Sequence, residues 1–147
     1  MAKSINNMDE LEKALQPVLM GMVDELTERV YQTLNYFLQK YYNSYSPKSY
    51  RRQFDFLRSA VKTKVKVKGN KIEASVYIDT DAMDNYYNAT GYQVATWANR
   101  GLHGGLDTGS NTPHVWDDTM DETVNNGELL RLAVDYLRSK GFSVTNY

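Results

Sequence analysis

The side chains best suited to metal chemistry are two histidines, His103 and His114, which stand eleven residues apart. Aspartates lie near both of them, and histidine together with carboxylate can bind zinc or a non-haem iron. Neither the spacing nor the surrounding pattern matches a known ligand set, and both histidines belong to a glycine-rich region where polar residues are ordinary. We therefore predict structural or solvated histidines, with no metal site and no cofactor.

The glycine-rich segment 101–113, GLHGGLDTGSNTP, does not match a phosphate-binding loop. Such a loop needs glycines that lead into a helix N-terminus, usually with Lys and Ser or Thr behind them. A Ser-His-Asp triad assembles in space without a fixed spacing, but no nucleophile-elbow pattern occurs. The lack of cysteine excludes thiol catalysis and thiolate metal sites. The sequence therefore predicts no catalytic residues and a protein that is not an enzyme.

Four lysines alternate with other residues along one predicted strand and are expected to share one face of it, at a spacing of about 6.5 Å: Lys62, Lys64, Lys66 and Lys68. Rows of this kind can contact phosphates, so a surface facing DNA or a DNA channel is one interpretation, though not the favoured one. The alternative is a charged solvent face or edge that resists aggregation between sheets. No aromatic residue interleaves the lysines, so a stacking platform for single strands is not indicated.

The stretch Tyr41–Val61 contains the candidates for a protein–protein interface. The chain has 12 tyrosines against 4 phenylalanines and 2 tryptophans, and a large ring with a polar tip suits a surface that is wet before assembly and buried after it. Tyrosine and arginine are also enriched at interface centres. The interface candidates are Tyr41, Tyr42, Tyr45, Tyr50, Arg51, Arg52 and Phe54. The alternative is that this stretch packs locally against its own sheet.

The elements that must position these residues begin with a long helical pattern. Apolar residues recur in steps of three and four from Met8 to Tyr41, and Asn6 or Asn7 is predicted to cap the helix. Pro17 predicts a break or kink, because proline inside a helix costs about 3 kcal/mol. Residues 1–17 are therefore expected to form a flexible arm or a short helix before a main helix, Val18–Asn43. The apolar stripe is broad, so the helix needs a second partner from this domain or from another subunit.

A period of two replaces the helical pattern at Val61 and continues to Ile78, with Gly69-Asn70 between the two runs. This pattern predicts a β-hairpin with one buried and one wet face. A helix is predicted over Glu128–Lys140, with Gly141 as its stop. The shorter expected elements are a helix capped by Ser49 and running to Ala60, a strand or one helical turn over Gln93–Asn99, a helix over Thr119–Val124, and a last strand or a return to the core around Phe142 and Val144.

These elements predict an α+β fold, in which a long N-terminal helix packs on a small antiparallel β-sheet with a C-terminal helix. A chain of 147 residues with 41% hydrophobic content suits a single domain, 1–147, with one core. Its net charge of -1 gives no global attraction to nucleic acid or membrane. Acids interrupt the first apolar run, and no stretch approaches the ~20 apolar residues of a spanning helix, so we expect no signal peptide, no membrane partner and a soluble protein.

The order of elements and several short motifs resemble a known family. The first motif, a YxxYxPKxYxR-like element, consists of Tyr42, Tyr45, Pro47, Lys48, Tyr50, Arg51, and then Leu57 and Ser59. The glycine–histidine loop Gly101-Leu102-His103-Gly104-Gly105 and the tail Gly141-Phe142-Ser143-Val144 follow the hairpin and the closing helix. Together they resemble the tail-completion (head–tail joining, neck) proteins of long-tailed bacteriophages over about Val18–Val144. Arg52, Gln53 and Phe54 stand where that family usually has Arg-Thr-Gly.

The resemblance implies a small virion structural protein, a neck or tail-terminator subunit, with no catalytic residues. It implies a homo-oligomeric ring, typically a hexamer, whose partners are other copies of the chain, the tail-tube proteins and the head–tail connector proteins. It also implies a location at the head–tail junction of the virion after synthesis in the host cytoplasm, with DNA passing through the ring channel. The alternative function is a small nucleic-acid-binding protein that uses the Lys62–Lys71 hairpin.

Overall fold

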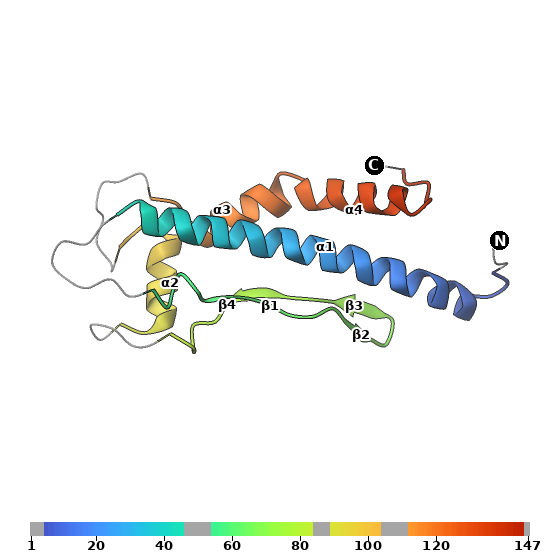
Figure 1. The fold of residues 1–147 in the computed structure, drawn as a ribbon, viewed down its shortest axis with the longest axis horizontal. Helices are drawn as coiled ribbons and strands as arrows, with labels where there is room; N and C mark the ends of the chain where they lie inside the picture. The colour runs from blue at the N-terminus through green and yellow to red at the C-terminus, as the bar shows by residue number, and fades with distance from the viewer. Residues whose placement is uncertain (1–4, 46–53, 84–88, 104–111, 146–147) are drawn as a thin grey trace.

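The computed structural model describes residues 5–45, 54–83, 89–103 and 112–145. One helix, α1 (Met8–Asn43), runs the length of the molecule, and the other elements pack along it. A β-hairpin lies along one side of α1, while the helices after the glycine-rich segment lie along another side (Figure 1). The predicted α+β fold, with a long N-terminal helix, a small antiparallel strand set and a C-terminal helix, is confirmed.

Helix α1 begins where its capping residue predicts. The side chain of Asn7 accepts a hydrogen bond from the Glu10 amide at 2.9 Å, and this contact satisfies one of the free amides of the first turn. Acidic Asp9 and Glu10 stand in that turn, where the helix dipole favours negative charge. At the other end, the Ser44 amide donates to the Lys40 carbonyl, so the helix ends at Asn43 as predicted.

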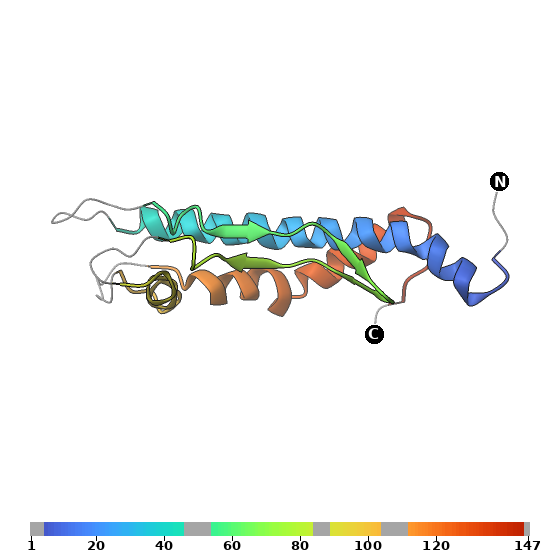
Figure 2. The ribbon, with the colours of Figure 1, turned by 90° about the horizontal axis from the view of Figure 1, so that it is seen from below.

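Pro17 lies inside α1 and does not end it. The expectation of a separate short helix or arm before a main helix at Val18 is therefore wrong for residues 8–17, which belong to the same continuous helix. Figure 2 shows the N-terminal turns inclined to the rest of α1, as expected of a helix that contains a proline. A proline removes one helical hydrogen bond, and a bend accommodates its ring without breaking the helix on either side.

The hairpin consists of two paired segments on each arm. Strand β1 (Ala60–Lys62) pairs antiparallel with β4 (Val76–Ile78), and β2 (Lys66–Lys68) pairs antiparallel with β3 (Lys71–Glu73). Gly69 has φ of 59° in the two-residue turn that joins β2 to β3, a conformation open to glycine at little cost. The predicted hairpin and its turn are confirmed.

The segment before the hairpin differs from the prediction. Residues 55–58 form a turn in which the Arg58 amide donates to the carbonyl oxygens of Phe54 and Asp55. Ala60 then opens strand β1. The predicted helix running to Ala60 is therefore absent from residues 54–60, while its expected cap, Ser49, lies outside the described residues.

Within the described residues after the hairpin, the chain forms four helical segments. Of the two alternatives for Gln93–Asn99, the structure has a helix, α2 (Gly91–Asn99), which Thr90 and Gln93 cap reciprocally. Helix α3 (Val115–Met120) continues into a π-helical turn, η1 (Asp121–Asn125), where a short helix was predicted. Helix α4 (Glu128–Ser139) is followed by Gly141, whose φ is 91°, while residues 142–145 form no strand. In the described parts of the chain, no helix is both long enough and apolar enough to cross a membrane.

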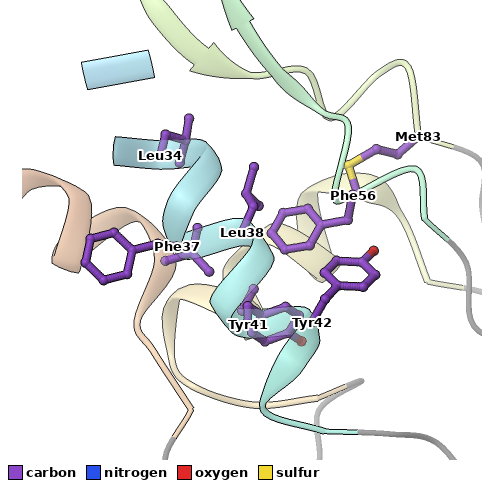
Figure 3. Packing of buried hydrophobic residues seen from close by; sticks show 9 residues of the cluster. Leu34, Phe37, Leu38, Tyr41, Tyr42, Phe56 and Met83 are labelled. Carbon is purple, nitrogen blue, oxygen red and sulfur yellow. The ribbon is translucent and has the colours of Figure 1, made fainter. Parts of the chain in front are cut away.

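The hydrophobic core lies at the C-terminal end of α1. Leu34 and Leu38 are fully buried there, beside Phe37, Tyr41 and Tyr42 (Figure 3). Side chains from the turn before β1, the end of the hairpin, α2 and α3 complete the cluster: Phe56, Met83, Ala98 and Val115. The N-terminal half of α1 is different, because every side chain from Met8 to Leu26 is half-buried or exposed.

A substitution at Gly91 tests the close packing between α2 and the hairpin end. A Cβ at this position would lie 2.1 Å from the Thr80 carbonyl oxygen and 3.0 Å from the Met83 Cβ. Although Gly→Ala within a helix ordinarily stabilises by about 1 kcal/mol, we expect Gly91→Ala to destabilise the fold by about 1–3 kcal/mol. Urea unfolding measures this change.

The matched control for that experiment is Gly69→Asn. No atom lies within 4 Å of the Cβ position of Gly69, and asparagine tolerates positive φ, so the free energy of unfolding should change little. A neutral or stabilising Gly91→Ala would show that α2 does not approach Thr80 as closely as the structure has it.

Candidate assembly surfaces

Tyr41 and Tyr42, two of the interface candidates, lie in the core of the subunit. The Tyr41 hydroxyl donates a hydrogen bond to the Leu102 carbonyl at 2.7 Å, and its ring meets Phe56 edge-on with 5.7 Å between centroids. The Tyr42 hydroxyl accepts a hydrogen bond from the Leu57 amide at 3.3 Å. Both residues are buried. Of the two interpretations of this stretch, local packing describes Tyr41 and Tyr42.

The other interface candidates divide into two groups. Tyr45 is half-buried, with its ring 4.8 Å from the His103 ring. Phe54 is exposed, and one face of its ring stacks on Tyr42. Tyr50, Arg51 and Arg52 lie outside the described residues. Among the described candidates, Tyr45 and Phe54 thus retain surface that a partner could cover.

The two histidines have separate environments. His103 is buried and stacks on Tyr41, with the ring planes 15° apart and the centroids 4.3 Å apart. Its Nε2 lies 3.1 Å from the Ser44 hydroxyl, so it ties the end of α1 to the start of the glycine-rich segment. His114 is exposed, and its Nδ1 lies 2.9 Å from the Asn99 carbonyl oxygen. Because a carbonyl oxygen only accepts, this nitrogen carries the proton.

Asn99 has a structural role that the sequence pattern did not reveal. Its side-chain oxygen accepts hydrogen bonds from the amides of Trp116 and Asp117 at 2.9 and 2.8 Å. These amides belong to the first turn of α3, whose own N-cap residue, His114, makes no side-chain cap bond. A cap from a distant helix has no sequence signature, because the spacing is not local. Within residues 5–45, 54–83, 89–103 and 112–145, no three acidic, histidine or cysteine side chains gather into a potential metal site.

The hairpin register divides the lysine row. Three residues, 63–65, separate β1 from β2, whereas two residues, 74 and 75, separate β4 from β3. Since Thr63 pairs with Ser75 through two hydrogen bonds, the extra residue lies at Lys64–Val65 opposite Ala74. One extra residue on one strand is a β-bulge, and it reverses the faces of all residues beyond it.

Residues that pair across two strands point to the same face. Lys62 pairs with Val76, which packs against the core, and it therefore faces α1. Beyond the bulge, Val67 pairs with Ile72 on that inner face, so Lys66 and Lys68 point outwards. The prediction that all four lysines share one face is wrong, because the bulge is invisible in an unbroken Val–Lys alternation.

Carboxylates neutralise two of the lysines. Lys62 forms an ion pair with Glu28 of α1 and lies over the Tyr31 ring, 5.9 Å from its centroid. Lys68 pairs with Glu73 at 2.7 Å. The hydrogen bond from Lys62 lowers the pKa of Glu28, and the same bond raises the pKa of Lys62. Lys62 therefore fastens the hairpin to α1, while Lys64 and Lys66 are exposed.

Two further surfaces on α1 are candidates for contact with another protein. The first, the apolar stripe, lies in the N-terminal half, where Met8, Leu11, Leu15, Leu19 and Met22 recur in steps of three and four without being buried. The second, the α1–η1 groove, has a volume of about 500 Å³ and is lined by Arg29, Gln32, Thr33, Tyr36, Phe37, Lys40 and Glu122. The breadth of the helical pattern indicated the stripe; the groove had no sequence signal beyond Tyr36 lying off the main apolar line.

A comparison with protein families identifies the chain. The YomN family model matches residues 7–139, nearly the whole chain, and the protein therefore belongs to the YomN family, which is phage-derived. No curated protein and no solved structure matches the chain. The family match and the resemblance noted from the sequence both indicate a phage protein. The family match does not indicate tail completion.

The Lys62–Glu28 pair predicts a pH dependence of stability. A lowered Glu28 pKa contributes stability at pH values above the ordinary value of 4.5, and this contribution is lost as the pH falls through the lowered pKa. A raised Lys62 pKa contributes stability that is fully present below the ordinary value of 10.5 and is lost as the pH rises through the raised pKa. Glu28→Gln should therefore lower the melting temperature slightly at neutral pH and have no effect in strong acid.

Thermal unfolding followed by circular dichroism across pH measures that difference. Glu25→Gln, an exposed carboxylate on the same helix, is the matched control and should melt like the parent at every pH. A Glu28→Gln effect of the same size at acidic and neutral pH would contradict the role given to the ion pair.

Proposed function

We propose that this protein is a bacteriophage virion structural subunit, a tail-completion or head–tail joining protein of the neck, which acts by assembling with copies of itself into a ring. Its work is protein–protein contact and not catalysis. The phage-derived family supports the phage part of this proposal, and the motif order supports tail completion by resemblance. The ring would contact tail-tube and head–tail connector proteins, with DNA passing through its channel.

The observation that carries the proposal is the uneven burial along α1. The C-terminal half of the helix supplies most of the core, whereas the apolar side chains from Met8 to Leu26 are half-buried or exposed. Apolar surface removed from water contributes roughly 25 cal/mol per Å², so a helix of this kind gains stability when another chain covers it. A subunit completed by its neighbours meets that requirement.

The nucleic-acid-binding alternative receives less support from the geometry. The bulge separates Lys62 from Lys66 and Lys68, and two of the four lysines already pair with carboxylates. Phosphate binding needs several cations on one surface. The exposed Lys64 and Lys66 remain suited to the lining of a DNA channel, where steering and not tight binding is required.

A pair of substitutions separates assembly from folding. Leu15→Ser lies in the apolar stripe and should cost the folded subunit little, while it weakens oligomer formation because the covering neighbour loses apolar contact. Leu34→Ala lies in the core, where the side chain is fully buried, and should lower the free energy of unfolding by about 2–5 kcal/mol. Urea unfolding, light scattering after gel filtration and electron microscopy of the particles make the measurements.

The proposal fails if the purified chain stays monomeric at high concentration and neither forms rings nor caps tail tubes. Tight DNA binding that weakens steeply with added salt would instead favour the nucleic-acid-binding alternative.

A further inference from the structure

The N-terminal turns of α1 project from the rest of the molecule. Helix α4 runs antiparallel to α1, with Arg29 paired to Glu128 at 3.4 Å and Gly21 lying against the Tyr136 hydroxyl. Since α4 ends at Ser139, the segment of α1 before Pro17 extends past it. Figures 1 and 2 both show this end of α1 reaching beyond the hairpin turn and beyond α4. We call Met8–Gln16 the projecting segment.

The projecting segment combines apolar and acidic side chains. Met8 is 68% exposed, and Leu11 and Leu15 follow it along one side of the helix. The segment also carries three acids, Asp9, Glu10 and Glu12, against a single lysine, Lys13. It is therefore an apolar ridge within an acidic surface.

The α1–η1 groove presents an exposed aromatic ring and basic side chains. Arg29 and Lys40 stand at its two ends along α1, and Glu122 of η1 is its one acid. Tyr36, which is 61% exposed, provides aromatic surface between the two bases, whereas Phe37 is buried in the core. Because Arg29 already pairs with Glu128, Lys40 is the cation that the groove offers to an acidic partner, beside the exposed Tyr36 ring.

We infer that the projecting segment of one copy of this chain docks in the α1–η1 groove of a neighbouring copy. Leu11 and Leu15 would cover Tyr36, and the acids of the segment would face Lys40. The lengths also agree: at 1.5 Å per residue, Met8–Gln16 is about 13 Å long, and Arg29 to Lys40 spans about 16 Å along α1. This inference rests on the proposed function, for which it names the contact surface.

The contact is head-to-tail, because each copy gives a segment to one neighbour and a groove to the other. A heterologous contact of this kind closes into a ring when the rotation between neighbours permits it. Pairing of two apolar stripes would instead be isologous and stop at a dimer.

Cross-linking through engineered cysteines tests the contact, because the chain has no cysteine of its own. Leu11→Cys protein is mixed with Tyr36→Cys protein, and a short bismaleimide is added. The expected product is a covalent pair that contains one chain of each variant, while neither variant alone gives a pair. Tyr77→Cys, on an exposed hairpin position, replaces Tyr36→Cys as the matched control and should give no product with Leu11→Cys.

Charge reversal gives a second measurement in the full chain. Lys40→Glu should weaken assembly by at least about tenfold through repulsion of the acidic segment, and Glu12→Lys in the same chain should restore it. Circular dichroism establishes that both variants are folded.

The outcomes separate the two proposals. If rings form but Leu11→Cys and Tyr36→Cys do not cross-link, the inference is overturned and the proposed function stands. The same holds if Glu12→Lys does not restore the assembly of the Lys40→Glu chain. Cross-linking of Leu11→Cys with itself shows isologous pairing and also overturns the inference. A chain that forms no oligomer overturns both.

Discussion

The packing of Leu34, Leu38, Tyr41 and Tyr42 at one end of α1 is the interaction on which the rest of the structure depends. The turn before β1, the hairpin end, α2 and α3 all reach this cluster and do not form a core of their own. A two-stranded hairpin alone is marginal in water, and the short helices here are below the length at which isolated helices persist. Each becomes stable by covering part of the same helix end.

This arrangement divides α1 into two regions with different structural roles. The C-terminal region is surrounded on several sides and fixes the fold, whereas the N-terminal region has the hairpin turn and α4 beside it and keeps its apolar stripe half-exposed. Domains usually bury most of the apolar surface that their size allows. The continuous stripe in partial contact with water is therefore the feature on which the proposed assembly rests.

The sequence predicts the types of the helices and strands better than it predicts how they pair and pack with one another. The helical period located α1 and α4, and the period of two located the hairpin, because these patterns reflect burial along a single element. The bulge at Lys64–Val65 escaped prediction, since residue types alternate across it without interruption. The capping of α3 by Asn99 and the burial of Tyr41 and Tyr42 depend on partners distant in the chain. Pro17 is a further example: a proline costs free energy inside a helix, yet α1 continues on both sides of it.

Pro17 has no amide hydrogen, and the carbonyl of Lys13 therefore lacks its partner within α1. The turn that joins the projecting segment to the rest of α1 therefore has one backbone hydrogen bond fewer and can bend more easily. In a closed ring, the number of copies sets the angle between neighbours, and small changes in the direction of a connecting element alter that angle. In the proposed ring, bending at Pro17 would let the copies fit slightly different curvatures with no change in the packed end of the molecule.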